Sequence, residues 1–248
     1  MSDPLTYYVC ALTAVFITGL SKGGFAGIGV LAMPLLSLSV DPLMAAGIML
    51  PILIVQDFHA VTAFRRHFDA TVLKVMLPGM AAGVLTGFAF AEIVNTTLVL
   101  GAVGVISIIF GTQKLLNIGA SNVINPSNNI IGAFLGIVSG FTSQIAHAGA
   151  PPYQLWVLPK QLPRDTLVGT TAICFTALNL MKVPAFIALG QLSATNLTYS
   201  LYLLPFALLS TFIGTKIVKK IEPDRFYFFI YFCLVILGFK LVFEAIAS

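Results

Sequence analysis

Long apolar stretches alternate with short polar ones along the whole chain. Read against the roughly 20 residues that a membrane-spanning helix needs, the pattern predicts eight apolar segments. They cover residues 5–38, 43–64, 70–91, 96–115, 130–158, 167–189, 197–218 and 226–246. The first and fifth segments are about 30 residues long and are interrupted near the middle by small or polar residues. We therefore expect these two to be broken or re-entrant helices and the others to be single transmembrane helices.

The composition places these segments in a lipid bilayer. Hydrophobic residues make up 58% of the 248 residues and charged residues only 9%, with a mean hydropathy of +0.99. A soluble domain carries about 25% charged residues, and a core of this size cannot hide so much apolar surface from water. The chain is thus predicted to be an all-α integral membrane protein. Its formal net charge of +4 is spread along the chain, which gives no support to nucleic-acid binding.

Basic residues indicate which connections face the cytoplasm, because lysine and arginine concentrate in short cytoplasmic loops. If every segment crosses, the ten loop cations divide six against four; if the fifth segment enters and leaves on one side, all ten lie on one face. They are Arg65, Arg66, Lys74, Lys114, Lys160, Arg164, Lys216, Lys219, Lys220 and Arg225. The stronger bias favours a re-entrant fifth segment with its ends in the cytoplasm. With the first segment taken as a similar hairpin, both termini are predicted to lie outside.

The two halves of the chain show weak internal similarity at an offset of 122 residues. The aligned stretches are Ala26-Gly27 with Ala148-Gly149, and residues 61–64 with residues 183–186. The halves, residues 1–116 and 130–248, are joined by a polar linker at 117–129. Each half would hold one broken segment plus three transmembrane helices. If both broken segments are hairpins, each half crosses an odd number of times, so the halves are inverted repeats, an architecture common in secondary transporters.

Polar side chains inside apolar segments are the candidates for function, because an unsatisfied polar group in hydrocarbon costs several kcal/mol. They gather at the two breaks: Ser21, Lys22, Gly23 and Gly24 in the first, and Thr142, Ser143, Gln144, His147 and Gly149 in the second. A broken helix creates a helix N-terminus at membrane depth, whose free N–H groups and positive dipole end bind anions. Pro151 and Pro152 are typical of the first turn of such a helix. Together the breaks predict a positive, donor-rich pocket for a small anion.

Three further polar residues are candidates for coupling to an ion gradient. Asp57 lies inside the second segment, Asn179 follows it at the repeat offset, and Lys182 lies three residues further on. An acidic residue at this depth is a candidate carrier of a proton or a sodium ion. Simpler interpretations stay open: Asp57 in a packing ion pair, Lys22 extending to the membrane surface, and His147 as a packing residue.

The residues around the first break resemble a known family. The stretch Gly19-Leu20-Ser21-Lys22-Gly23-Gly24-Phe25-Ala26-Gly27 is followed by Met33-Pro34-Leu35-Leu36 and, in the second half, by another glycine-and-proline break. This arrangement resembles the sulfite exporter TauE/SafE family of membrane transporters, and the resemblance covers almost the whole chain. It implies transport, across a bacterial inner membrane, of a small anion such as sulfite, a sulfonate or a related oxyanion.

The function predicted from these features is secondary transport of a small anion, held between the breaks of the first and fifth segments and carried by alternating access. An anion channel is the near alternative. An intramembrane enzyme acting on a lipid-soluble substrate is the alternative from another class, although the chain has no G-x-S-x-G, no C-x-x-C and no phosphate loop. No cofactor or metal is expected, and the sequence does not indicate an oligomeric state.

Overall fold

The computed structural model describes residues 4–23, 29, 32–91, 93, 96–116, 125–218, 220 and 222–247. Over these residues the chain is helical and contains no strand, so the predicted all-α fold is confirmed. The helices are α1 (Pro4–Gly23), α2 (Ala32–Ser37), α3 (Pro42–Phe64), α4 (Ala70–Ala89), α5 (Thr96–Leu115), α6 (Asn129–Ala146), α7 (Ala150–Val157), α8 (Arg164–Ala188), α9 (Ala194–Val218) and α10 (Pro223–Ala247), with a short 3-10 helix, η2 (Leu158–Lys160), after α7. By length and composition, seven of these helices could cross a membrane: α1, α3, α4, α6, α8, α9 and α10.

Both long apolar segments are divided into a long helix and a short one. In the first, α1 is followed by α2, and in the fifth, α6 is followed by α7. The second break is described completely. Of the first break, Gly24 lies outside the described residues, as do residues 117–124 of the predicted linker.

Side-chain caps fix where two of the long helices begin. Asp69 Oδ1 accepts a hydrogen bond from the Val72 backbone N–H at 2.9 Å, at the start of α4. Asn128 Oδ1 accepts from the N–H groups of Ile130 and Ile131 at 2.9 and 3.2 Å, at the start of α6. These bonds satisfy donors that a helix start leaves unpaired, and they place both starts within a residue of the predicted segment boundaries.

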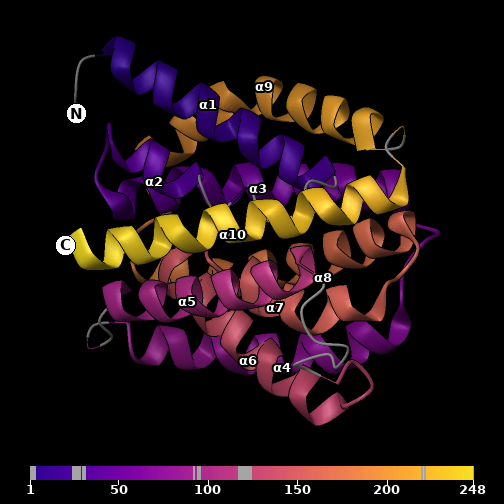
Figure 1. Cartoon of the computed structure of the whole chain (residues 1–248). Coiled ribbons are helices and arrows are strands. Elements are labelled where there is room, and N and C mark those ends of the chain that lie inside the picture. The colour runs from indigo at the N-terminus through magenta and orange to yellow at the C-terminus, as the bar shows by residue number, and fades with distance from the viewer. Residues whose placement is uncertain are drawn as a thin grey trace.

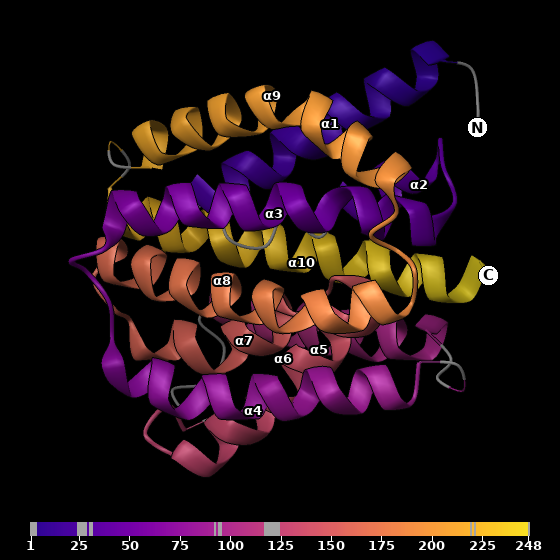
Figure 2. The same ribbon diagram turned by 180° about the vertical axis from the view of Figure 1, so that it is seen from behind.

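The long helices pack in pairs that join the two halves of the chain (Figures 1 and 2). α1 packs against α9, α4 against α6, α3 against α8, and α5 against α10. Glycines allow the closest of these approaches. A Cβ added to Gly83 of α4 would lie 2.0 Å from the carbonyl oxygen of Ile137 in α6, and one added to Gly23 of α1 would lie 2.4 Å from the backbone of Gly214 in α9. The two halves are therefore interleaved rather than placed side by side.

The connections between the helices lie at two opposite ends of the bundle (Figures 1 and 2). The first turn of α1, the last turn of α10 and the α8–α9 connection lie at one end, and the α3–α4 connection lies at the other. The fifth segment begins and ends at the α3–α4 end. Trp156 Nε1 donates to the carbonyl of Asn128 at 3.1 Å, so the two arms of the segment meet there, and the backbone N–H of Asp69 donates to Thr170 Oγ1 at 2.8 Å. The chain thus folds back on itself between α6 and α7.

Candidate functional site

The second break is built around His147, which ends α6. This residue has φ 53° and ψ 23°, a left-handed conformation that glycine usually adopts at the end of a helix. Its backbone N–H donates to the carbonyl of Ser143 at 3.1 Å. Hydroxyl groups hold the next residues: Thr142 Oγ1 donates to the carbonyl of Ala148 at 3.0 Å, and Ser139 Oγ donates to that of Gly149 at 2.7 Å. Thr142 and Gly149 therefore shape the break.

The start of α7 offers fewer backbone donors than the sequence suggested. Pro151 and Pro152 occupy its first turn, as predicted, but proline has no N–H. The N–H of Tyr153 already donates to the carbonyl of Gly149 at 3.4 Å. This helix start therefore has fewer free N–H groups than the sequence indicated, so side chains must supply most of the donors for an anion.

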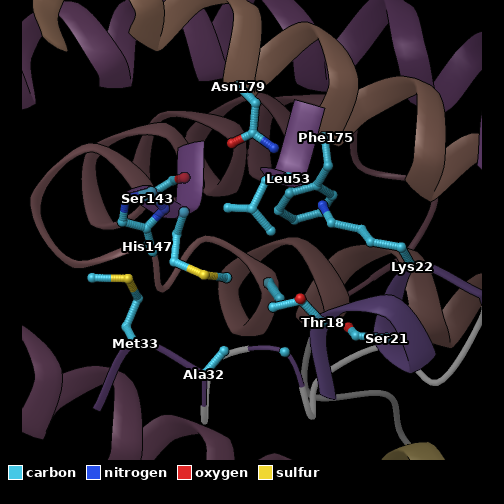
Figure 3. Close-up of a pocket in the computed structure, with 13 residues that line it drawn as sticks. Thr18, Ser21, Lys22, Ala32, Met33, Leu53, Ser143, His147, Phe175 and Asn179 are labelled. Carbon is cyan, nitrogen blue, oxygen red and sulfur yellow. The ribbon is translucent and has the colours of Figure 1, made fainter. Parts of the chain in front are cut away.

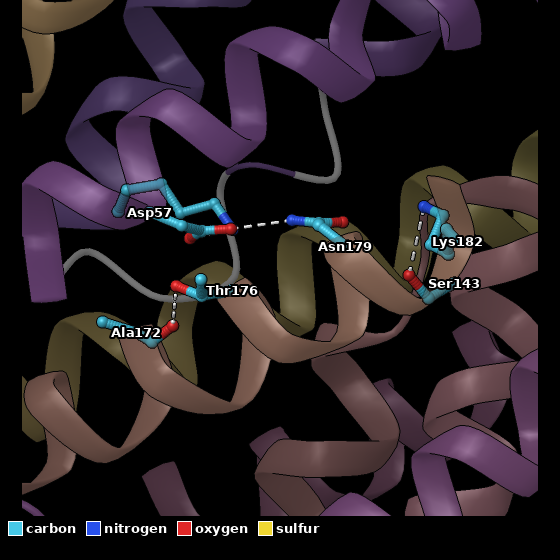
Figure 4. Close-up of polar contacts among 7 residues, drawn as sticks. Asp57, Ser143, Ala172, Thr176, Asn179 and Lys182 are labelled. Carbon is cyan, nitrogen blue, oxygen red and sulfur yellow. Dashed lines mark hydrogen bonds and ion pairs between the residues drawn. The ribbon is translucent and has the colours of Figure 1, made fainter. Parts of the chain in front are cut away.

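At the first break, Lys22 forms a buried ion pair with Asp57 of α3. Lys22 Nζ lies 2.7 Å from Asp57 Oδ1, and the two side chains are 14% and 0% exposed. Asn179 of α8 donates from Nδ2 to the other carboxylate oxygen at 2.7 Å (Figure 4). The sequence assigned Lys22 to an anion site and Asp57 to coupling, and the structure joins both residues with Asn179 in one network.

Lys182, one turn beyond Asn179 on α8, is completely buried. Its Nζ lies 3.0 Å from His147 Nδ1 and 3.5 Å from Ser143 Oγ, both at the second break. Figure 4 shows the contact with Ser143. It also lies 5.3 Å from the centre of the Phe186 ring. The three coupling candidates thus divide between the breaks: Asp57 contacts Lys22 of the first and is held by Asn179, whereas Lys182 contacts the second.

A cavity of about 60 Å³ lies between the two breaks (Figure 3). Its lining comes from both broken segments and from α3 and α8: Thr18, Ser21, Lys22, Gly29, Ala32, Met33, Met49, Leu53, Ser143, His147, Ala150, Phe175 and Asn179. A single water needs on the order of 10–15 Å³ by this measure of volume. The cavity therefore has room for a few waters or for a small oxyanion in their place.

Five of the predicted site residues line this cavity: Ser21, Lys22, Ser143, His147 and Asn179. The other described candidates do not. Gly23 packs against Gly214, and the Gln144 side chain packs against Gly87. Asp57 and Lys182 lie behind the lining, where each contacts residues that do face the cavity.

The sequence interpretation missed Thr18 and Phe175. Each precedes a predicted residue by one helical turn, Thr18 before Lys22 and Phe175 before Asn179, so helical periodicity was the available signal. The apolar lining residues Met33, Met49 and Leu53 could not have been found in this way, because nothing in an apolar segment distinguishes a cavity wall from a lipid-facing surface. Among the described residues, no group of three His, Cys, Asp or Glu side chains is placed to hold a metal ion.

Comparison with known proteins identifies the family of this chain. The family model described as "Sulfite exporter TauE/SafE" matches residues 11–241 of the 248. Neither the curated proteins nor the solved structures contain a match to the chain. The family match covers both breaks, all seven helices long enough to cross a membrane over most of their length, and every residue of the cavity. The chain is a multi-pass membrane protein that belongs to the sulfite exporter TauE/SafE family of transporters.

Proposed function

We propose that this protein is a secondary transporter of a small anion, sulfite, a sulfonate or a related oxyanion, and that the anion is held in the cavity between the two breaks. The observation that carries the proposal is the cavity lining, in which Lys22 from one broken segment and His147 from the other face the same space. Channels and carriers both need such a site. Both halves of the chain border the cavity, as movement of one half against the other requires, and this favours a carrier.

The repeat offset supports movement of one half against the other. Residues that are 122 positions apart meet at the cavity: Asp57 bonds to Asn179, and the pairs Ser21 and Ser143, and Leu53 and Phe175, line it. The helix pairs show the same relation. At this offset α1 corresponds to α6 and α4 corresponds to α9, so the α1–α9 pair is equivalent to the α6–α4 pair. These features support two inverted repeats related by an axis through the cavity, around which alternating access would take place.

The site has a polar, charged wall and an apolar wall, which together suit an anion that carries a small apolar group. Two lysines and one carboxylate surround the cavity, so the site is positive when both amines are protonated. Ser21, Ser143 and Asn179 add uncharged hydrogen-bonding groups. The remaining wall is apolar, with Met33, Met49, Leu53 and Phe175. Such a wall would accept the carbon atoms of an organosulfonate, while the polar wall binds its oxygens.

The orientation follows from the basic residues. Arg65 and Arg66 lie in the α3–α4 connection, and Lys160 and Arg164 lie where the fifth segment ends, at the same end of the bundle. Cytoplasmic loops attract such residues. We place this end in the cytoplasm and both termini outside, with the protein in the inner membrane.

Counterflow in proteoliposomes tests the function. Vesicles preloaded with unlabelled sulfite, thiosulfate, sulfoacetate, taurine or acetate are diluted into trace radiolabelled sulfite without oxygen. A carrier accumulates label transiently and saturably when preloaded with an anion that it accepts, and Lys22→Ala abolishes this accumulation, whereas Lys74→Ala, at an exposed lysine of α4, leaves it unchanged. Conductance without saturation or exchange would identify a channel. No movement of any of the anions, with folded protein confirmed by size exclusion, contradicts the proposal.

A further inference from the structure

The charged groups around the cavity are unequally paired. Lys22 has a carboxylate partner, since its Nζ lies 2.7 Å from Asp57 Oδ1. Lys182 has none: in the described part of the chain, its amine contacts only His147 and Ser143, in addition to the ring of Phe186. Its side chain is 0% exposed. One buried amine beside the cavity therefore lacks a counter-ion.

An ammonium group that is buried without a counter-ion is unfavourable, and removal of its proton relieves the cost. An anion in the cavity would supply the missing negative charge. Binding of the proton and binding of the anion are then coupled. Protonation of Lys182 raises the affinity of the cavity for the anion, and the bound anion raises the affinity of Lys182 for the proton. From this pairing of an uncompensated amine with an anion cavity, and resting on the proposed function, we propose that Lys182 binds one proton together with the anion and releases it when the anion leaves.

The contact between Lys182 and His147 connects the proton to the anion. Lys182 does not line the cavity, but His147 and Ser143 do. An ammonium group only donates, so His147 Nδ1 must accept from it, which places the ring proton on Nε2. His147 Nε2 is buried and has no hydrogen-bond partner among the described residues. Nε2–H is therefore the donor left for the anion. The contact of Lys182 with Nδ1 of the same ring fixes the proton on Nε2 and so connects the lysine to the anion.

Asp57 is a weaker candidate for the proton. Both of its oxygens are already engaged, one by Lys22 and the other by Asn179. Protonation would break the ion pair and leave the Lys22 ammonium without its partner. The titratable groups facing Lys182 are His147 from the α6–α7 break, Lys22 from α1 and Asp57 from α3. The only titratable side chain of α4, which also packs on α8, is the exposed Lys74.

The balance of the step is simple. A hydronium ion gives one proton to the Nζ lone pair of Lys182 as one anion enters the cavity, so that an O–H bond breaks and an N–H bond forms. On the other side the proton returns to water by the reverse step as the anion leaves, and nothing is oxidised or reduced. A monoanion would cross with no net charge, and a dianion would carry one negative charge.

Calorimetric titration of the purified protein tests this inference. The probes are methanesulfonate and thiosulfate, which hold no proton near neutral pH, titrated in two buffers that differ in ionisation enthalpy. Wild-type protein is expected to take up about one proton per anion bound, and over the pH range of this uptake its affinity is expected to fall about tenfold per pH unit. Lys182→Gln, which keeps a donor toward His147, should bind without proton uptake and without this slope. Lys74→Gln should match the wild type.

The remaining outcomes separate this inference from the proposed function. Proton uptake that persists in Lys182→Gln and disappears in Asp57→Asn assigns the proton to Asp57 and overturns the inference alone. Binding by wild-type protein without proton uptake also overturns it alone. If neither anion binds to folded wild-type protein, the anion site itself is contradicted. Where Lys182→Gln does not fold, Lys182→Met gives the same comparison, because it too removes the amine.

Discussion

The ion pair between Lys22 and Asp57 makes a prediction that separates stability from transport. Asp57 is fully buried and Lys22 is 14% exposed. Removing one partner of a buried pair leaves an uncompensated charge and costs about 3–5 kcal/mol. In Lys22→Met the buried carboxylate of Asp57 keeps its hydrogen bond from Asn179, so we expect the variant to cost ~3 kcal/mol, the lower end of that range. For a chain of this size, ~3 kcal/mol corresponds to a fall of roughly 6–12 °C in the melting temperature.

The double variant Lys22→Met/Asp57→Asn carries no unpaired charge. It should recover more than half of the lost melting temperature, while transport remains absent in both variants because the cation at the cavity is missing. Thermal unfolding in detergent and counterflow on the same preparations measure the two effects. Lys240→Met is the matched control, since the Lys240–Glu244 pair is partly exposed and such pairs contribute about 0–1 kcal/mol. Additive losses in the double variant, or an unchanged melting temperature in Lys22→Met, would refute the buried pair.

Three other predictions address the break, the helix packing and the topology. His147→Gly removes a left-handed strain of about 1–2 kcal/mol, so it should retain the melting temperature but lose anion binding, and binding retained at wild-type affinity would count against the site. Gly83→Val places a branched side chain where even a Cβ would lie 2.0 Å from the Ile137 carbonyl, so well-folded protein at wild-type yield would contradict the α4–α6 packing. In a background without native cysteines, an impermeant thiol reagent should label Ala194→Cys from outside the cell and Asn125→Cys only after lysis, and the reverse pattern would invert the topology.

The apolar pattern predicted most of the helices because lipid imposes a simple rule on the chain. A single span needs about 20 apolar residues, and the two segments that are much longer, around Lys22 and His147, are the two that are broken in the structure. The predicted linker and the division into two halves remain predictions, since residues 117–124 lie outside the described residues. The break residues could be found from the sequence because an unsatisfied polar group in hydrocarbon is unfavourable, so polar side chains inside an apolar segment indicate a structural or functional role.

The partners of these residues could not be found in the same way. Whether Lys22 contacts Asp57 depends on the rotation of α1 and α3 about their axes, which small differences in packing decide. Asp57 and Asn179 were recognised as repeat equivalents, but an offset of 122 residues does not reveal that they bond to each other. The contact of Lys182 with His147 likewise depends on how deeply the α6–α7 hairpin enters the bundle.

The location of the anion is the central claim, and a structure determined in selenite tests it most directly. Selenite is the selenium analogue of sulfite, and its anomalous scattering identifies it without ambiguity. We expect one anomalous peak in the cavity, within hydrogen-bond distance of Lys22 Nζ and His147 Nε2, and no peak there in Lys22→Met. An empty cavity in wild-type protein whose binding is saturated, or a peak at another place that Lys22→Met leaves unchanged, would contradict the account.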